Sequence, residues 1–123
     1  MTDAVNWYLS GMTFQQQDRH EEALHAFGQS LLIDPENTGA WVGKGMALAR
    51  LGEYQDAVQS FDRALALGDQ NPFVWYSRGL ALHVLGEDKE AIPSYNRALA
   101  IEQKNHLVWI GLGHALHTLE QYE

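Results

Sequence analysis

The chain has 123 residues, of which 46% are hydrophobic and 20% are charged, as expected for a soluble folded domain. Its formal net charge of −8 argues against nucleic acids and membrane surfaces as partners, because both are anionic. The absence of cysteine excludes disulfides, zinc–thiolate sites and cysteine nucleophiles.

Seven helices are predicted along the chain. They cover residues 4–17, 20–33, 38–51, 54–67, 72–85, 88–101 and 106–119. An Asp or Asn precedes the first helix of each pair, where its side chain can accept a hydrogen bond from an unpaired backbone N–H. These residues are Asp3, Asn37, Asn71 and Asn105. Pro93 lies near the start of the sixth helix, where we expect a small local distortion and no break.

The helices repeat with a period of 34 residues. In the first helix of each pair, tryptophan recurs at Trp7, Trp41, Trp75 and Trp109, and glycine at Gly11, Gly45, Gly79 and Gly113. In the second helix, alanine recurs at Ala23, Ala57 and Ala91, and an aromatic residue at Phe27, Phe61 and Tyr95. Steps of three and four residues place each set on one helix face. Because glycine inside a helix costs about 1 kcal/mol, its recurrence indicates close helix–helix approach.

This pattern resembles the tetratricopeptide repeat family. The resemblance covers the whole chain and is carried by Trp41, Gly45, Leu48, Ala57, Phe61, Ala64 and their counterparts. It implies an all-α fold, a right-handed superhelix of antiparallel helix hairpins (an α-solenoid) with about three and a half repeats. The repeats would be 4–37, 38–71 and 72–105 with a half repeat at 106–123, all in a single domain over 1–123.

The resemblance also implies that the first helices line a concave groove that holds part of a partner protein. The groove candidates are Tyr8, Met12, Val42, Met46, Arg50, Phe73, Tyr76, Leu80, His83, Ile110 and His114. Adaptable methionines beside rigid aromatic residues suit an apolar peptide or helix. The alternative is that several of these residues only pack against neighbouring helices.

One subgroup of the family binds chaperone carboxyl termini through a clamp of lysine, asparagine and arginine side chains. The matching positions here hold Tyr8, Met12, Gly43, Phe73 and Ser77. The clamp is therefore absent, and we expect no chaperone-tail binding.

The helix at 106–119 carries a face that a further helix would cover. Its residues are Trp109, Leu112, Gly113, Leu116 and Leu119. Either the chain is a fragment of a longer array or another copy covers this face. The second case would make the chain a self-assembling structural module, which is the alternative function.

Other kinds of site have weaker support. His83, His114 and His117 are near one another in the repeat register, and imidazole suits zinc, nickel or copper, but we expect them to make polar groove contacts and bind no metal. No nucleophile motif or phosphate loop is present, so neither an enzyme nor a cofactor is expected. The amino terminus does not resemble a signal peptide and no apolar stretch could span a bilayer, which predicts a cytoplasmic protein.

Overall fold

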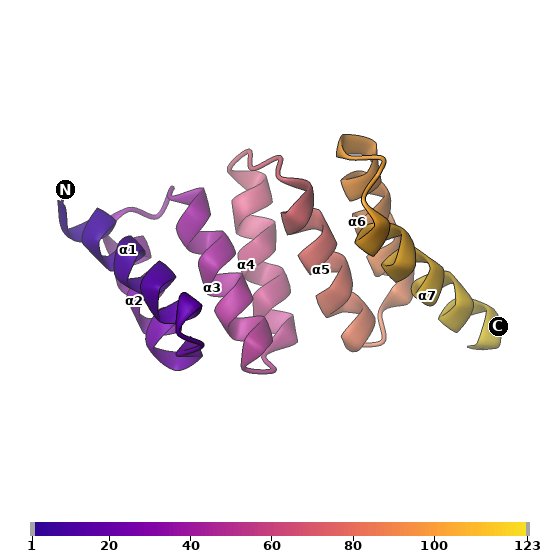
Figure 1. Ribbon diagram of the computed structural model, residues 1–123, viewed down its shortest axis with the longest axis horizontal. Coiled ribbons are helices and arrows are strands. Elements are labelled where there is room, and N and C mark those ends of the chain that lie inside the picture. The colour runs from indigo at the N-terminus through magenta and orange to yellow at the C-terminus, as the bar shows by residue number, and fades with distance from the viewer. Residues whose placement is uncertain (1, 123) are drawn as a thin grey trace. The chain divides into compact units, whose positions relative to one another are not determined.

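The computed structural model describes residues 2–122, and over these residues the chain forms seven helices and no strand (Figure 1). They are α1 (Thr2–Gln16), α2 (His20–Ile33), α3 (Thr38–Arg50), α4 (Tyr54–Ala66), α5 (Pro72–Val84), α6 (Asp88–Ile101) and α7 (His106–Tyr122). All seven predicted helices are confirmed, and α6 is continuous through Pro93. None of the described helices is long and apolar enough to cross a membrane.

The chain divides into two compact units. Unit 1 contains α1 to α4 and extends to Asp69, whereas unit 2 begins at Gln70 and contains α5 to α7. Within unit 1, α1 packs against α2 and α3 against α4, and α2 also packs against α3. Within unit 2, α6 packs against both α5 and α7. Unit 1 is thus built from two helix hairpins, and unit 2 from one hairpin and the additional helix α7.

The predicted helix caps form at three of the four positions. The side-chain oxygen of Asn37 accepts a hydrogen bond from the backbone N–H of Ala40 at 3.1 Å. The side chains of Asn71 and Asn105 likewise accept from backbone N–H groups of the helices that follow them. Asp3 is the exception, because α1 begins at Thr2 and Asp3 lies inside its first turn. An acid there still interacts favourably with the positive end of the helix dipole.

Each hairpin turn contains one residue in the left-handed backbone region. This residue is Asp18 in the first hairpin, with φ 58°, and it is Gly52 and Gly86 in the next two, with φ 83° and 80°. The three positions are 34 residues apart, so the repeat extends to the turns. Aspartate tolerates this conformation better than most residues with a side chain, which explains its presence in place of glycine.

The core of each hairpin is an aromatic ring seated against a glycine of the preceding helix. The pairs are Phe27 with Gly11, Phe61 with Gly45 and Tyr95 with Gly79. A Cβ added to any of these glycines would lie 2.6 to 2.7 Å from a ring carbon, so only glycine fits. The three aromatic residues are almost fully buried. In α7 the equivalent Gly113 differs, because a Cβ there would meet no atom within 4 Å.

This difference predicts opposite effects for the same substitution at two equivalent glycines. Gly45→Ala should lower the free energy of unfolding by about 1–3 kcal/mol, because the new methyl overlaps the buried Phe61 ring. Gly113→Ala should leave it unchanged or raise it by up to about 1 kcal/mol, because alanine favours the helix and meets open space. Urea denaturation followed by circular dichroism would measure both. Equal effects at the two sites would contradict the packing described above.

Candidate functional site

A hollow of about 270 Å³ opens between α1 and α3 in unit 1. Its lining residues are Met12, Gln15, Gln16, Asp18, His20, Met46 and Arg50. The structure therefore brings together three of the expected groove residues, Met12, Met46 and Arg50. Met12 is 39% exposed, although its side chain is apolar. We refer to this feature as the α1–α3 hollow.

A side-chain hydrogen bond joins α1 to α3 beside the α1–α3 hollow. The Nε2 group of Gln15 in α1 donates to the backbone carbonyl of Gly43 in α3 at 3.1 Å. Gly43 itself is buried, and a Cβ there would lie 2.4 Å from the Phe27 ring. The hydrogen bond and the missing Cβ both allow α1 and α3 to lie close together beside the hollow.

Two other groove candidates in unit 1 are partly used in packing. The Tyr8 ring lies 6.0 Å from the Phe27 ring, centroid to centroid, and its hydroxyl would be 2.7 Å from a Cβ on Gly39. Val42 is half-buried. Tyr8 thus makes the contacts between neighbouring helices that the alternative expects, and the groove role of Val42 stays a prediction.

In unit 2, four groove candidates are exposed on α5 and α7. They are Phe73, Leu80, Ile110 and His114. Phe73 is 42% exposed and Ile110 is 55% exposed. Tyr76 is half-buried instead, and its ring lies 6.1 Å from that of Tyr95. This unit therefore has an apolar surface of its own on its first helices.

His83 is held by a carboxylate. Its Nδ1 group donates a short hydrogen bond to Oδ1 of Asp88, a residue that is buried at the start of α6. The bond joins α5 to α6 at their turn. Within residues 2–122 there is no group of three histidine, cysteine or acidic side chains placed to hold a metal ion. The side chain of His117 lies 3.2 Å from the Gln121 amide nitrogen of the same helix.

Tyr95 combines complete burial with an unsatisfied hydroxyl. Its side chain is 0% exposed, and its hydroxyl has no hydrogen-bond partner among the described residues. The pKa of Tyr95 is raised to about 12. The largest cause is burial, and electrostatic interaction with Tyr76 and Asp88 adds to it. Sequence reasoning identified this aromatic position but missed the hydroxyl. The available signal was tyrosine at a position where the other two repeats have phenylalanine.

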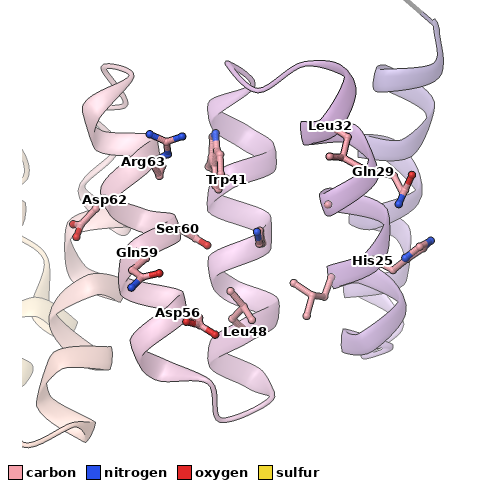
Figure 2. A pocket seen from close by; sticks show the side chains of 13 residues that line it. His25, Gln29, Leu32, Trp41, Leu48, Asp56, Gln59, Ser60, Asp62 and Arg63 are labelled. Atoms are coloured by element: carbon pink, nitrogen blue, oxygen red, sulfur yellow. The ribbon is translucent and has the colours of Figure 1, made fainter.

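A larger hollow, of about 950 Å³, lies where α2, α3 and α4 meet in unit 1 (Figure 2). Trp41 of α3 is one of its lining residues and lies beside Arg63 of α4 (Figure 2). The Lys44 ammonium and the Arg63 guanidinium lie 5.2 and 5.3 Å from the centre of a Trp41 ring, within the range of cation–π attraction. Leu32, at the edge, is 78% exposed. Sequence reasoning did not find this hollow, because its residues come from three helices.

Three of the five residues expected on the open face of α7 are exposed. Trp109, Gly113 and Leu116 are exposed, with Trp109 at 53%, and Leu119 is half-buried. Leu112 is only 8% exposed, which corrects its placement on this face. It shares steps of four and three residues with the buried Val108 and Ala115, so it belongs to the stripe that packs within unit 2. We call Trp109, Gly113 and Leu116 the α7 face.

Comparison with protein families agrees with the repeat pattern. A tetratricopeptide repeat profile matches residues 8–72, and a second profile of the same family matches residues 72–105. The chain belongs to the tetratricopeptide repeat family. No curated protein sequence matches the chain.

Solved structures of other tetratricopeptide repeat proteins have the same fold. The first repeat domain of Spaghetti (RPAP3), bound to the HSP90 peptide SRMEEVD, matches with a TM-score of 0.92 at 24% identity over 97% of this chain and 94% of that one. YrrB, a repeat protein with an unusual peptide-binding site, matches with a TM-score of 0.87 at 24% identity. The match covers 93% of this chain and 59% of YrrB. The second repeat domain of human RPAP3, in complex with the HSP70 peptide SGPTIEEVD, matches with a TM-score of 0.84 at 21% identity. The match covers 91% of this chain and 97% of that domain. At these identities the likeness concerns the fold.

The raised pKa of Tyr95 predicts a specific loss of stability in alkaline solution. The unfolded chain releases the Tyr95 proton near the ordinary pKa of 10.0, whereas the folded chain retains it up to about 12. The contribution of Tyr95 to the free energy of unfolding is therefore fully present below pH 10. It is lost as the pH rises from 10 toward 12. At pH 11 the deprotonation of Tyr95 in the unfolded chain should lower the free energy of unfolding by about 1.4 kcal/mol.

Tyr95→Phe is the matched variant for this prediction, because it keeps the ring and removes the group that titrates. At neutral pH its free energy of unfolding should equal or slightly exceed that of the wild type, since the lost hydroxyl has no partner. Between pH 8 and pH 11 it should lose about 1.4 kcal/mol less than the wild type in urea titrations. An identical loss in both proteins would show that Tyr95 titrates normally in the folded state.

Proposed function

We propose that this tetratricopeptide repeat protein is a non-catalytic binding protein that holds an apolar segment of a partner in the α1–α3 hollow. The observation that carries the proposal is that Met12 of α1 and Met46 of α3 both line the hollow. Methionine is unbranched and polarizable, so a pair of methionines adapts its shape to an apolar side chain placed between them. Binding would remove the exposed Met12 side chain from water.

Polar groups at the edge of the hollow suit a peptide backbone. Gln16 is exposed beside the methionines and carries both a donor and an acceptor, and Arg50 and Asp18 offer charges of opposite sign. A ligand with an apolar centre and polar ends fits this arrangement. The exposed Phe73, on α5, gives unit 2 an apolar surface of its own.

A selection from a random peptide library on the immobilised wild-type chain would test this function. The ligands recovered should carry apolar residues, and Met12→Glu with Met46→Glu should weaken their binding by at least about tenfold, because a carboxylate in the hollow would lose its hydration on contact with an apolar side chain. Met12 is exposed and Met46 is partly buried, so circular dichroism and urea denaturation must show that the variant is folded before its binding is compared.

Leu32→Glu is the matched control, because it places the same charge on another exposed apolar residue in unit 1, at the larger hollow. It should bind the selected peptides like the wild type. If Leu32→Glu abolishes binding and the methionine variant does not, the binding site lies at the hollow beside Trp41 and the proposal fails.

The proposed ligand differs from the acidic chaperone peptides bound by the structural neighbours. The peptide SRMEEVD carries three acidic side chains besides its terminal carboxylate. Among the described residues that line the α1–α3 hollow, Arg50 is the one permanent cation, and Asp18 opposes it. Such an edge cannot neutralise several carboxylates.

Titration of the chain with the SRMEEVD peptide should therefore show no binding tighter than about 1 mM in calorimetry. The same experiment with a peptide recovered from the library provides the positive control. Micromolar binding of SRMEEVD that disappears in Arg50→Ala would instead assign the chain to the recognition of acidic carboxyl termini.

A further inference from the structure

The hollow beside Trp41 contains two cations that have no carboxylate partner. The Lys44 ammonium and the Arg63 guanidinium lie 5.2 and 5.3 Å from the centre of a Trp41 ring. Within residues 2–122 neither side chain forms an ion pair with an acidic residue. Because two positive charges that converge on one ring repel each other, a carboxylate placed beside them would be attracted by both.

Unit 2 shows that the repeat itself does not require this arrangement. Arg78 stands 34 residues after Lys44, but its guanidinium donates a hydrogen bond to the Ser94 hydroxyl of α6. Among the described residues, Arg97 is the cation that lies over the Trp75 ring, at 5.6 Å. Two cations over one tryptophan are therefore a feature of the hollow in unit 1 and not of the fold.

The α2 side of the hollow is apolar and lacks a side chain at one position. Leu24, Gly28 and Leu32 all line the hollow, and steps of four residues place them on one face of α2. A Cβ added to Gly28 would meet no atom within 4 Å, so packing does not require glycine here, although glycine is unfavourable inside a helix. The missing side chain leaves room between two leucines, of which Leu32 is 78% exposed.

We infer that the hollow beside Trp41 is a second binding site, for a short segment of a partner protein with one acidic residue between large aliphatic residues. The carboxylate would lie beside Lys44 and Arg63, and the aliphatic side chains would cover Leu32 and fill the space over Gly28. In an extended segment, residues two positions apart lie on the same side, so the expected pattern is Leu-x-Glu-x-Leu. A hollow of about 950 Å³ is large enough for these side chains.

The acidic residues of the hollow limit the ligand to one carboxylate. Asp56 and Asp62 also line it, and Figure 2 shows Asp56 near Leu48, well away from Arg63. A ligand with several neighbouring acids, such as SRMEEVD, would bring its further carboxylates toward these aspartates and be repelled. A second copy of this chain, with a net charge of −8, is disfavoured for the same reason.

The probe is the peptide SLSESLS, acetylated and amidated at its ends so that the glutamate is its only charge. In an NMR titration of the full chain, the indole N–H resonance of Trp41 should shift with a Kd on the order of 500 µM. This resonance is assigned by its absence from the spectrum of Trp41→Phe, and the Trp109 resonance should stay in place. The neutral peptide SLSQSLS should bind about fivefold more weakly, and this difference should decrease as the salt concentration rises.

Two variants connect the binding to the hollow. Gly28→Leu should fold normally and abolish the shift, because the new side chain fills the space that a peptide leucine needs. Gly113→Leu is its matched control, since Gly113 is also a helical glycine in open space but lies in α7, and it should bind like the wild type. Lys44→Gln should weaken SLSESLS by about fivefold and leave SLSQSLS unchanged, a difference that altered packing alone would not produce.

Met12→Glu with Met46→Glu should bind SLSESLS normally, which separates this site from the α1–α3 hollow. If that variant abolishes the binding, the peptide lies in the α1–α3 hollow, and the inference fails while the proposed function stands. Equal binding of SLSESLS and SLSQSLS, an unmoved Trp41 resonance, or binding that Gly28→Leu leaves intact would each overturn the inference as well. A concentration-dependent dimer in sedimentation velocity that Gly28→Leu abolishes would assign the hollow to a second copy instead.

Discussion

Packing in both units depends on an aromatic ring seated against a glycine of the neighbouring helix. The Phe27 ring contacts the positions of Gly11 in α1 and Gly43 in α3, and the Tyr95 ring contacts those of Gly79 in α5 and Gly111 in α7. One ring therefore holds three helices together, because glycine lets the backbones approach where any side chain would overlap the ring. Burial of the ring supplies the stabilisation, and the absent Cβ supplies the space.

This arrangement leaves the outer surfaces of the helices free for binding. The core uses one stripe of each first helix, so Met12 and Met46 on other stripes of α1 and α3 are not needed for packing within the hairpins. Some surface residues also contact the core. The ring of Tyr76, which is half-buried on α5, lies 6.1 Å from the buried ring of Tyr95.

The sequence by itself determined the helices, their pairing and the family, because packing of a repeated interface imposes a period that stays visible in Trp41, Gly45 and Phe61. It could not determine which apolar residues remain exposed. Met12 and Tyr8 fit the same groove pattern, but Tyr8 packs over Gly39, and Leu112 turns into unit 2 while Trp109 does not. The pairing of His83 with Asp88 and the hollow beside Trp41 were also decided by tertiary structure. The physical reason is that exposure and contact depend on side chains from several helices at once, whereas periodicity describes each helix separately.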